Sequence, residues 1–122
     1  MAETILDGVK IEHFGHASFR ITYKDRFFYI DPYIRPDDGK KSELILVTHE
    51  HFDHCAQENI RELLEDVGTI VAPKGCLLQL DGLNVQVIEA GDEIDADGIL
   101  IKAVQAYNTN KYSSPGKVFH PR

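Results

Sequence analysis

Three histidines and two acidic residues fall within six consecutive positions, from His49 to His54, in the stretch LVTHEHFDHC. The whole chain contains six histidines, so half of them lie in this one segment. The segment directly follows the apolar run Leu44–Val47. A lone histidine would be explained as an ordinary surface residue. Three imidazoles and an aspartate at this spacing are instead the ligand types of a transition-metal site.

The spacing within the cluster indicates how such a site would be built. Residues two apart in an extended segment point the same way, so His49 and His51 can direct imidazole nitrogens at one cation. Asp53 and His54 follow on a turn and can face a second cation. Imidazole and carboxylate suit zinc, manganese or iron. Two such ions about 3.5–4 Å apart can hold a bridging hydroxide that attacks an ester or phosphate, with Asp53 as the catalytic residue that holds the water and moves its proton.

The segments before the cluster alternate apolar and polar residues, which is typical of strands. Val9–Phe14, Ala17–Tyr23 and Phe27–Ile30 are predicted to form an antiparallel meander that ends at Asp31-Pro32. Leu44–Val47 is apolar on both faces and is therefore predicted to be a central strand. The cluster begins at the carboxyl end of this strand, where functional groups of layered α/β folds tend to lie.

The segments after the cluster contain one clear helical pattern. Residues 57–66 are predicted to form a helix, because the apolar residues at 60, 63, 64 and 67 have the spacing of an amphipathic helix. Residues 69–72, 84–88 and 99–104 are predicted strands, residues 73–80 a short helix, and the acidic stretch AGDEIDADG a solvated turn. The pattern predicts one domain over residues 1–122, of α+β or layered αββα type, with a mixed sheet and flanking helices.

Composition excludes several classes of protein. The 122 residues carry 13 basic and 20 acidic side chains, a net charge of −7, so general binding of nucleic acid is not expected. The sequence contains neither a secretory signal nor an apolar run near the ~20 residues that span a bilayer, so no membrane association is expected. Two cysteines do not make a disulfide framework, which favours reduced thiols in the cytoplasm. A thiolate ligand from Cys55 is the less favoured alternative.

The motif Thr48-His49-x-His51-x-Asp53-His54 resembles the signature of the metallo-β-lactamase superfamily. Upstream, GHASFRI and FYIDP resemble a branch of small metal-dependent hydrolases in that superfamily. The resemblance covers most of the chain from residue 9 and implies both the fold and the metal. It leaves the substrate open, because the superfamily includes lactamases, thioesterases, phosphodiesterases, nucleases, lactonases and flavoprotein oxidases.

The resemblance also implies roles for single residues. It assigns His49 and His51 to a first metal, and Asp53 and His54 to a second. Asp31 matches an aspartate that supports a ligating histidine, although turn chemistry before a proline explains an aspartate there equally well.

The third ligand of the first metal should come from far downstream in the chain. The stretch QAYNTN resembles the place where relatives carry that histidine, and Asn108 is the candidate occupant of the position. Either His120 fills the role from a neighbouring position, which is the preferred interpretation, or the site is short of a ligand. His16 is a candidate for the lining of the pocket, although as a turn residue it needs no role, and His13 on a predicted strand is more simply structural.

The remaining ligands of the family come from a second half of the fold, which resembles nothing in this sequence. We therefore expect the amino-terminal half of a metallo-β-lactamase fold, a truncated or half-sized hydrolase that cleaves an ester, thioester, lactone or phosphoester of a small-molecule substrate through a metal-bound hydroxide. The alternative is a non-catalytic metal-binding or assembly module that retains the motif. Because a half-fold exposes an apolar sheet face, we expect either a homodimer or a separate carboxyl-terminal half to cover it.

Overall fold

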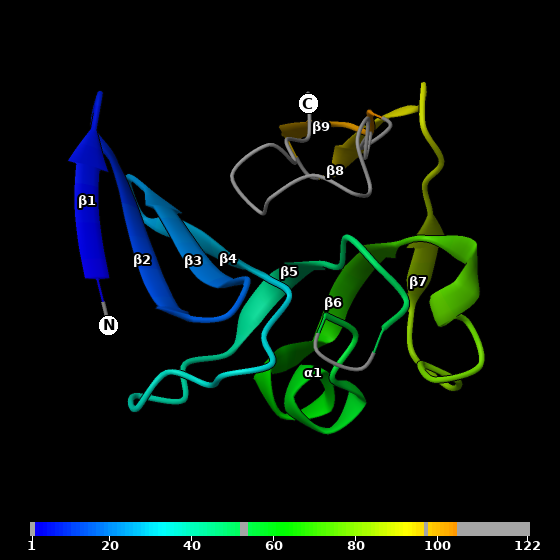
Figure 1. Ribbon diagram of the computed structural model, residues 1–122. Coiled ribbons are helices and arrows are strands. Elements are labelled where there is room, and N and C mark those ends of the chain that lie inside the picture. The colour runs from blue at the N-terminus through cyan, green and yellow to red at the C-terminus, as the bar shows by residue number, and fades with distance from the viewer. Residues whose placement is uncertain (1, 52–53, 97, 105–122) are drawn as a thin grey trace, which may run out of the picture. The chain divides into compact units, whose positions relative to one another are not determined.

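The structure is a computed structural model that describes residues 2–51, 54–96 and 98–104 (Figure 1). It divides into two compact units, one up to Val87 and the other from Ile88, and each is described here by itself. Among the described residues, the first unit holds a seven-stranded sheet whose strands lie in chain order, β1 to β7. The second unit holds the two-stranded sheet of β8 and β9.

The first four strands form an antiparallel meander. They are β1 (Ala2–Leu6), β2 (Val9–Gly15), β3 (Ser18–Tyr23) and β4 (Arg26–Ile30). Each pairs antiparallel with the next, which confirms the predicted meander of β2 to β4. Strand β1 was not predicted. It is joined to β2 by Asp7-Gly8, both at positive φ (52° and 80°), as a two-residue turn matched to the strand twist requires.

The next three strands are parallel, so the sheet is mixed, as predicted. They are β5 (Ser42–Leu46), β6 (Leu64–Ala72) and β7 (Val85–Val87). Strand β5 pairs parallel with both β4 and β6, which confirms its central place. The carboxyl ends of neighbouring parallel strands meet at one edge of the sheet. Asp31, after β4, and the histidine cluster, after β5, are therefore brought to the same edge.

Helix α1 (Gln57–Leu63) connects β5 to β6 and is shorter than the predicted helix 57–66. Leu64 is already extended, with φ −95° and ψ 131°, and begins β6. The apolar spacing holds in part, because Ile60, Leu63 and Leu64 are all buried, but Val67 is 83% exposed. The helix ends early because Val67, Gly68 and Thr69 are poor helix formers, whereas the β-branched valine and threonine suit a strand.

Two further expectations need correction in detail. The short helix predicted over 73–80 is only the 3-10 turn η1 (Lys74–Cys76), followed by turns. The acidic stretch predicted as a turn contains β8 (Glu93–Ala96), which pairs antiparallel with β9 (Ile99–Lys102). The alternation of Ile94 and Ala96 with acidic residues explains this strand, since the two apolar side chains lie opposite those of β9.

The core of the first unit lies between the sheet and α1 (Figure 1). Its buried members come from β4, β5, β6, α1, the segments that flank the histidine cluster, and η1 with the turn after it: Tyr29, Ile45, Val47, Cys55, Ile60, Leu63, Leu64, Ile70, Ala72, Cys76 and Leu80. The site at the end of β5 thus rests on packed side chains. Within the described ranges, no helix is long and apolar enough to cross a lipid bilayer.

A buried ion pair ties the meander to the loop before β5. Arg20, 8% exposed, donates to both carboxylate oxygens of Glu12 at 2.8 and 3.1 Å and to Asp38 Oδ1 at 2.9 Å. Its guanidinium carbon lies 5.5–5.9 Å from the ring centres of Phe14, Phe27 and Tyr29. The hydrogen bond from Arg20 lowers the pKa of the Glu12 carboxyl, although burial opposes this.

Replacing this carboxylate gives a test of the ion pair. A carboxyl whose pKa is lowered by folding stabilises the fold above its unfolded pKa of about 4.3, and this contribution is lost as the pH falls through the folded value. We expect Glu12→Gln to lower the free energy of unfolding by about 3 kcal/mol at pH 7, because a buried charge loses its partner. The difference from wild type should shrink between about pH 5 and pH 3.

Urea unfolding at a series of pH values measures both effects. Glu43→Gln, at an exposed position of β5, is the matched control and should leave the unfolding free energy nearly unchanged. Equal losses in the two variants, or a Glu12→Gln deficit that does not depend on pH, would contradict the account.

Candidate metal centre

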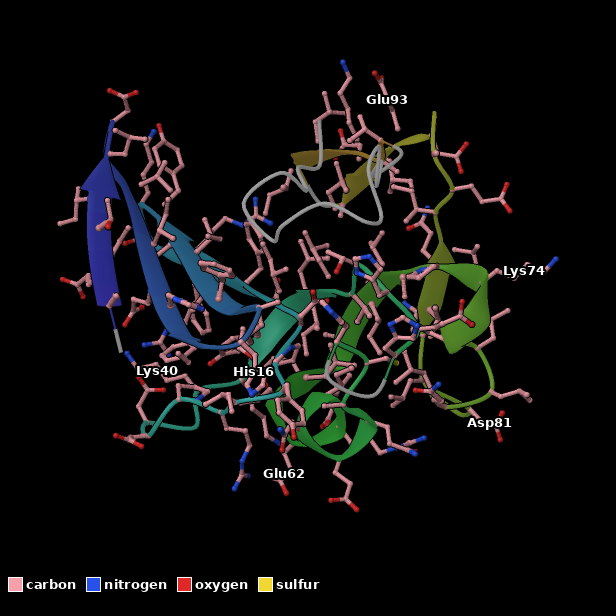
Figure 2. The ribbon with its side chains drawn as sticks, in the orientation of Figure 1. His16, Lys40, Glu62, Lys74, Asp81 and Glu93 are labelled. Carbon is pink, nitrogen blue, oxygen red and sulfur yellow. The ribbon has the colours of Figure 1, made fainter. Side chains whose placement is uncertain are left out.

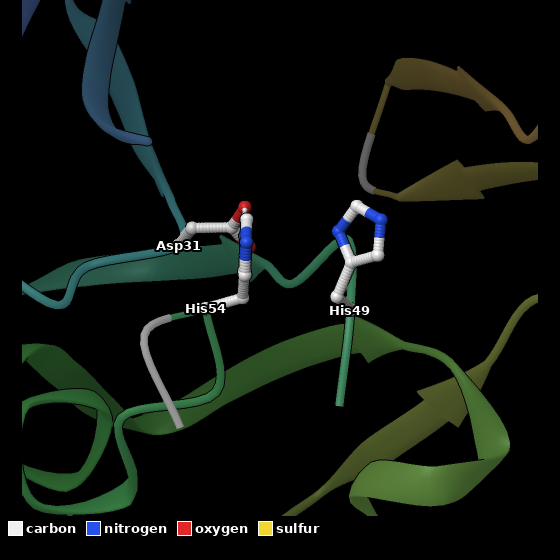
Figure 3. Close-up of side chains that lie close together, drawn as sticks. All are labelled: Asp31, His49 and His54. Carbon is white, nitrogen blue, oxygen red and sulfur yellow. Dashed lines mark hydrogen bonds and ion pairs between the residues drawn. The ribbon is translucent and has the colours of Figure 1, made fainter. Parts of the chain in front are cut away.

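Three side chains from two segments, one after β4 and one after β5, meet at the carboxyl edge of the sheet. Asp31 follows β4, His49 lies three residues beyond β5, and His54 precedes α1. One potential ligand atom from each residue lies within 4.8 Å of those of the other two. Figure 3 shows Asp31 and His54 next to each other and His49 facing them. The sheet topology thus gathers two of the predicted histidines around a carboxylate.

Asp31 is 1% exposed, and both of its carboxylate oxygens are occupied. Oδ1 accepts the backbone N–H of Thr48 at 2.7 Å, and Oδ2 accepts the Thr48 hydroxyl at 2.5 Å. Oδ2 also lies 2.6 Å from His54 Nδ1. These contacts use the carboxylate to orient neighbouring groups rather than to bind a cation itself. The contact that the resemblance implied, between Asp31 and a histidine of the motif, is present.

These contacts determine which nitrogen of each imidazole carries the hydrogen. An ionised carboxylate only accepts, so His54 Nδ1 must donate to Asp31. The single hydroxyl hydrogen of Thr48 goes to Asp31, so Thr48 Oγ1 accepts from His49 Nδ1 at 2.8 Å. In both histidines Nε2 is then the nitrogen that bears the lone pair. One carboxylate, directly and through one hydroxyl, sets both imidazoles in the form that binds a metal.

The remaining residues of the predicted site are placed as follows. The rings of His49 and His54 lie 4.5 Å apart and tilted by 50°, whereas those of His49 and His51 are stacked at 6.2 Å and 13°. His51 is exposed and does not belong to the group of three. Asp53, His120 and Asn108 lie outside the described residues, so their roles stay predictions.

The two amino-terminal histidines, His13 and His16, have contacts of their own. His13 Nε2 lies 2.6 Å from the carbonyl oxygen of His16, and the His13 ring stacks on Phe19 at 4.6 Å. His16, labelled in Figure 2, packs edge-on against Tyr33. Neither histidine is in the group of three around Asp31.

A turn distant in sequence fixes the backbone of the histidine segment. Gln79 Nε2 donates to the carbonyl of Glu50 at 3.1 Å, and the Cys76 thiol lies 3.7 Å from the carbonyl of His49. The Glu50 carboxylate occupies the place where a Cβ on Gly75 would stand. A side chain at position 75 would therefore displace the Glu50 carboxylate. Sequence analysis did not identify this turn as part of the site, and the only signal for it is the glycine in Lys74-Gly75-Cys76.

The two cysteines belong to the core and not to the ligand set. Cys55 is 2% exposed and Cys76 is completely buried. Burial raises the pKa of the Cys55 thiol, and it raises that of Cys76 to about 12. Burial therefore favours the thiol form of both, and neither sulfur belongs to the group of three around Asp31.

Known proteins share this sequence and fold. A family model described as a beta-lactamase superfamily domain matches residues 10–120. A UPF0173 protein of Pyrococcus abyssi is 39% identical over 100 residues, which are 78% of this chain and 47% of that protein. A UPF0173 metal-dependent hydrolase of Thermoplasma acidophilum is 29% identical over 88% of this chain and 51% of its own length.

Among solved structures, a protein of Parabacteroides distasonis, provisionally named a metal-dependent hydrolase, superimposes with a TM-score of 0.73 at 26% identity. The match covers 91% of this chain and 53% of that one. This chain thus spans about half the length of the relatives that it matches. The superfamily that the motif indicated, and the half-length correspondence, are both confirmed.

The Thr48 hydroxyl connects Asp31 to His49, and valine removes it while keeping nearly the same side-chain shape. Thr48→Val should lower the affinity for a divalent transition metal about 10- to 100-fold, because His49 loses the partner that sets its tautomer. Thr48→Ser keeps the hydroxyl and should restore most of the affinity. Competition with a chromophoric chelator measures the dissociation constants.

A matched control for this change is Thr22→Val, on strand β3. It should bind metal like the wild type. If Thr48→Val also binds like the wild type, the proposed hydrogen-bond chain does not prepare the site.

Proposed function

The chain belongs to the metallo-β-lactamase superfamily, and from this membership we propose that it is the metal-binding half of a metal-dependent hydrolase. The observation that supports the proposal most directly is the contact of Asp31 with both Thr48 and His54, which sets two imidazoles with Nε2 as the ligand nitrogen. The comparisons agree with the proposal. This chain matches the family model, it shares the fold of a solved structure, and its relatives have names that include metal-dependent hydrolase.

The donor set fits a transition metal. Neutral imidazole nitrogens with a nearby carboxylate suit zinc, manganese and iron, and we propose one or two such ions, with zinc as the first choice. His49 and His54 are proposed to present ligand nitrogens to the metal ion, and His51 and Asp53 to add donor atoms from the same segment. We propose His120 as a further ligand from the carboxyl-terminal residues.

A bound metal of this kind supplies a Lewis acid that activates water and polarises the bond to be cleaved. The residues of this chain have the complementary tasks. Asp31 and Thr48 keep two imidazoles in one orientation, so that a ligated ion would be held in a fixed place. Asp53 is proposed to hold the attacking water and take its proton. The substrate is proposed to be a small ester, thioester, lactone or phosphoester.

The alternative function is a non-catalytic metal-binding or assembly module. The observation that favours it is that the contacts of Asp31 orient two imidazoles, which prepares a metal site whether or not a reaction follows. Both functions require metal, but only the hydrolase requires Asp53 to act on water. The two can therefore be separated by measuring metal content and turnover on the same protein.

The double variant His49→Ala/His51→Ala tests the ligand assignment. Elemental analysis of purified protein should find zinc, manganese or iron in the wild type and nearly none in the variant, because the remaining donors cannot complete one tetrahedral site. His13→Ala/His16→Ala removes the same number of imidazoles and should retain the metal. Equal metal content in all three proteins would sink the assignment.

Hydrolysis is assayed on the same samples with phosphodiester, thioester and lactone substrates. We expect slow turnover by the 122-residue chain. An incomplete set of metal ligands would misplace the attacking water, and small misplacements of reacting groups lower the rate about 100-fold. Turnover that rises with added zinc or manganese and disappears in Asp53→Asn supports the hydrolase. Metal binding with no such turnover supports the module.

We propose that the sheet face formed by Ile11, Ile21 and Phe28 packs against further polypeptide. These residues are register partners across β2, β3 and β4, and each is only half-buried. They form an apolar row on the face opposite Glu12 and Arg20. The candidates for its cover are a second copy of the chain, in a homodimer, or a separate polypeptide equivalent to the other half of the relatives.

Light scattering at several concentrations tests this proposal. The isolated chain is expected to associate, and Phe28→Lys should weaken the association because it places a charge in the apolar row. Leu78→Lys is the matched control, since Leu78 is 92% exposed and belongs to the turn after η1. A stable monomer at all concentrations would contradict the proposal.

A further inference from the structure

Asp31 adopts a backbone conformation that an L-residue rarely takes. Its φ is +45°, in the left-handed region, while its side chain is 1% exposed. Such a conformation is sterically unfavourable, although aspartate tolerates it better than most residues. The turn that holds Asp31 must therefore be stabilised by its surroundings.

One stabilising group comes from β3. The Ser18 hydroxyl, completely buried, donates to the carbonyl oxygen of Asp31 at 2.7 Å. The Ser18 Oγ in turn accepts the backbone N–H of Ile34 at 2.9 Å. Ser18 thus bridges the first and the last residue of the turn 31–34 and uses both its donor and its acceptor to do so.

The other group comes from α1. Asn59 Nδ2 donates to the carbonyl oxygens of Pro32 at 3.0 Å and Tyr33 at 2.7 Å. Three successive carbonyls, of Asp31, Pro32 and Tyr33, therefore each accept a hydrogen from one of two side chains. Within the turn, the Tyr33 backbone N–H also donates to the Asp31 carbonyl at 2.7 Å, whereas proline offers no backbone donor. The two side chains therefore supply most of the hydrogen bonds described here for the three carbonyls.

We infer that Ser18 and Asn59 are positioning residues of the metal centre, which hold the turn 31–34 so that the buried Asp31 carboxylate meets Thr48 and His54. The inference rests on the proposed function, because it gives these contacts the task of preparing metal ligands. Neither residue contacts an imidazole. Ser18 acts on the Asp31 backbone directly, and Asn59 acts on it through the next two residues of the turn. A displacement of that backbone moves the two carboxylate oxygens together.

Ser18→Ala tests the inference against a matched variant, Ser42→Ala. Ser42 is also buried, at 2% exposure, and its hydroxyl also bridges backbone groups, those of Phe27 and Leu44. The two changes remove equivalent hydrogen bonds from the core. Only Ser18→Ala should weaken the binding of cobalt(II), by about 10-fold, and change the visible spectrum of bound cobalt.

Asn59→Ala provides a second variant, with Glu58→Ala on the same turn of α1 as its control. It should weaken cobalt binding to a similar degree, while Glu58→Ala should not. If Ser18→Ala fails to fold, this pair alone decides. Cobalt affinity and spectra that are the same in each variant and its control would overturn the inference.

A second readout needs no metal. Thr48 is exposed, but its backbone N–H donates to Asp31 Oδ1, and this hydrogen bond should slow its hydrogen exchange. In metal-free protein, Ser18→Ala and Asn59→Ala should speed exchange at Thr48 at least 10-fold, and both controls should leave it unchanged. If the wild type binds no cobalt, the proposed function fails, and the exchange rates alone support or overturn the positioning role.

Discussion

The site depends on one buried carboxylate. Asp31 is almost completely removed from water, and an ionised group in that position must be fully hydrogen-bonded. It is satisfied by the backbone N–H and hydroxyl of Thr48 and by His54 Nδ1. The contacts that satisfy the carboxylate are therefore also the contacts that orient the imidazoles. A fold that buries Asp31 at this place has to bring the histidine segment to it.

The parallel pairing of β4 with β5 makes this arrangement possible. Asp31 leaves β4 one residue after Ile30, which lies opposite Leu46, and its backbone N–H donates to the Leu46 carbonyl at 2.9 Å. The histidine segment then starts beside the aspartate and returns to it at His54. Ser18 and Asn59 fix the turn from one side, and the turn around Gly75 fixes the backbone of His49 and Glu50 from the other. The metal centre is thus prepared by β3, α1 and η1, none of which contributes a ligand.

The sequence predicts the parts of this arrangement that depend on local pattern. Alternation gave β2 to β4, the apolar run gave β5, and the density of imidazoles gave the site. The dipeptide Asp7-Gly8 is a typical hairpin turn and indicates that a strand precedes β2, although β1 was not predicted. The early end of α1 could not be inferred from apolar spacing, because Leu64 is buried equally well at the start of a strand. The roles of Ser18, Asn59 and Gly75 depend on contacts between residues 13 to 27 positions apart, which periodicity does not encode.

The central claim is that the Asp31 carboxylate sets the hydrogen on Nδ1 of two imidazoles. Nitrogen-15 NMR distinguishes a nitrogen that carries hydrogen from one that bears a lone pair, and it can be recorded on metal-free wild-type protein at about pH 8.5, where ordinary imidazoles are neutral. The account predicts that Nδ1 carries the hydrogen in both His49 and His54, whereas exposed His51 shows a mixture of tautomers. A hydrogen on Nε2 of either His49 or His54, or a mixture in both, would contradict it.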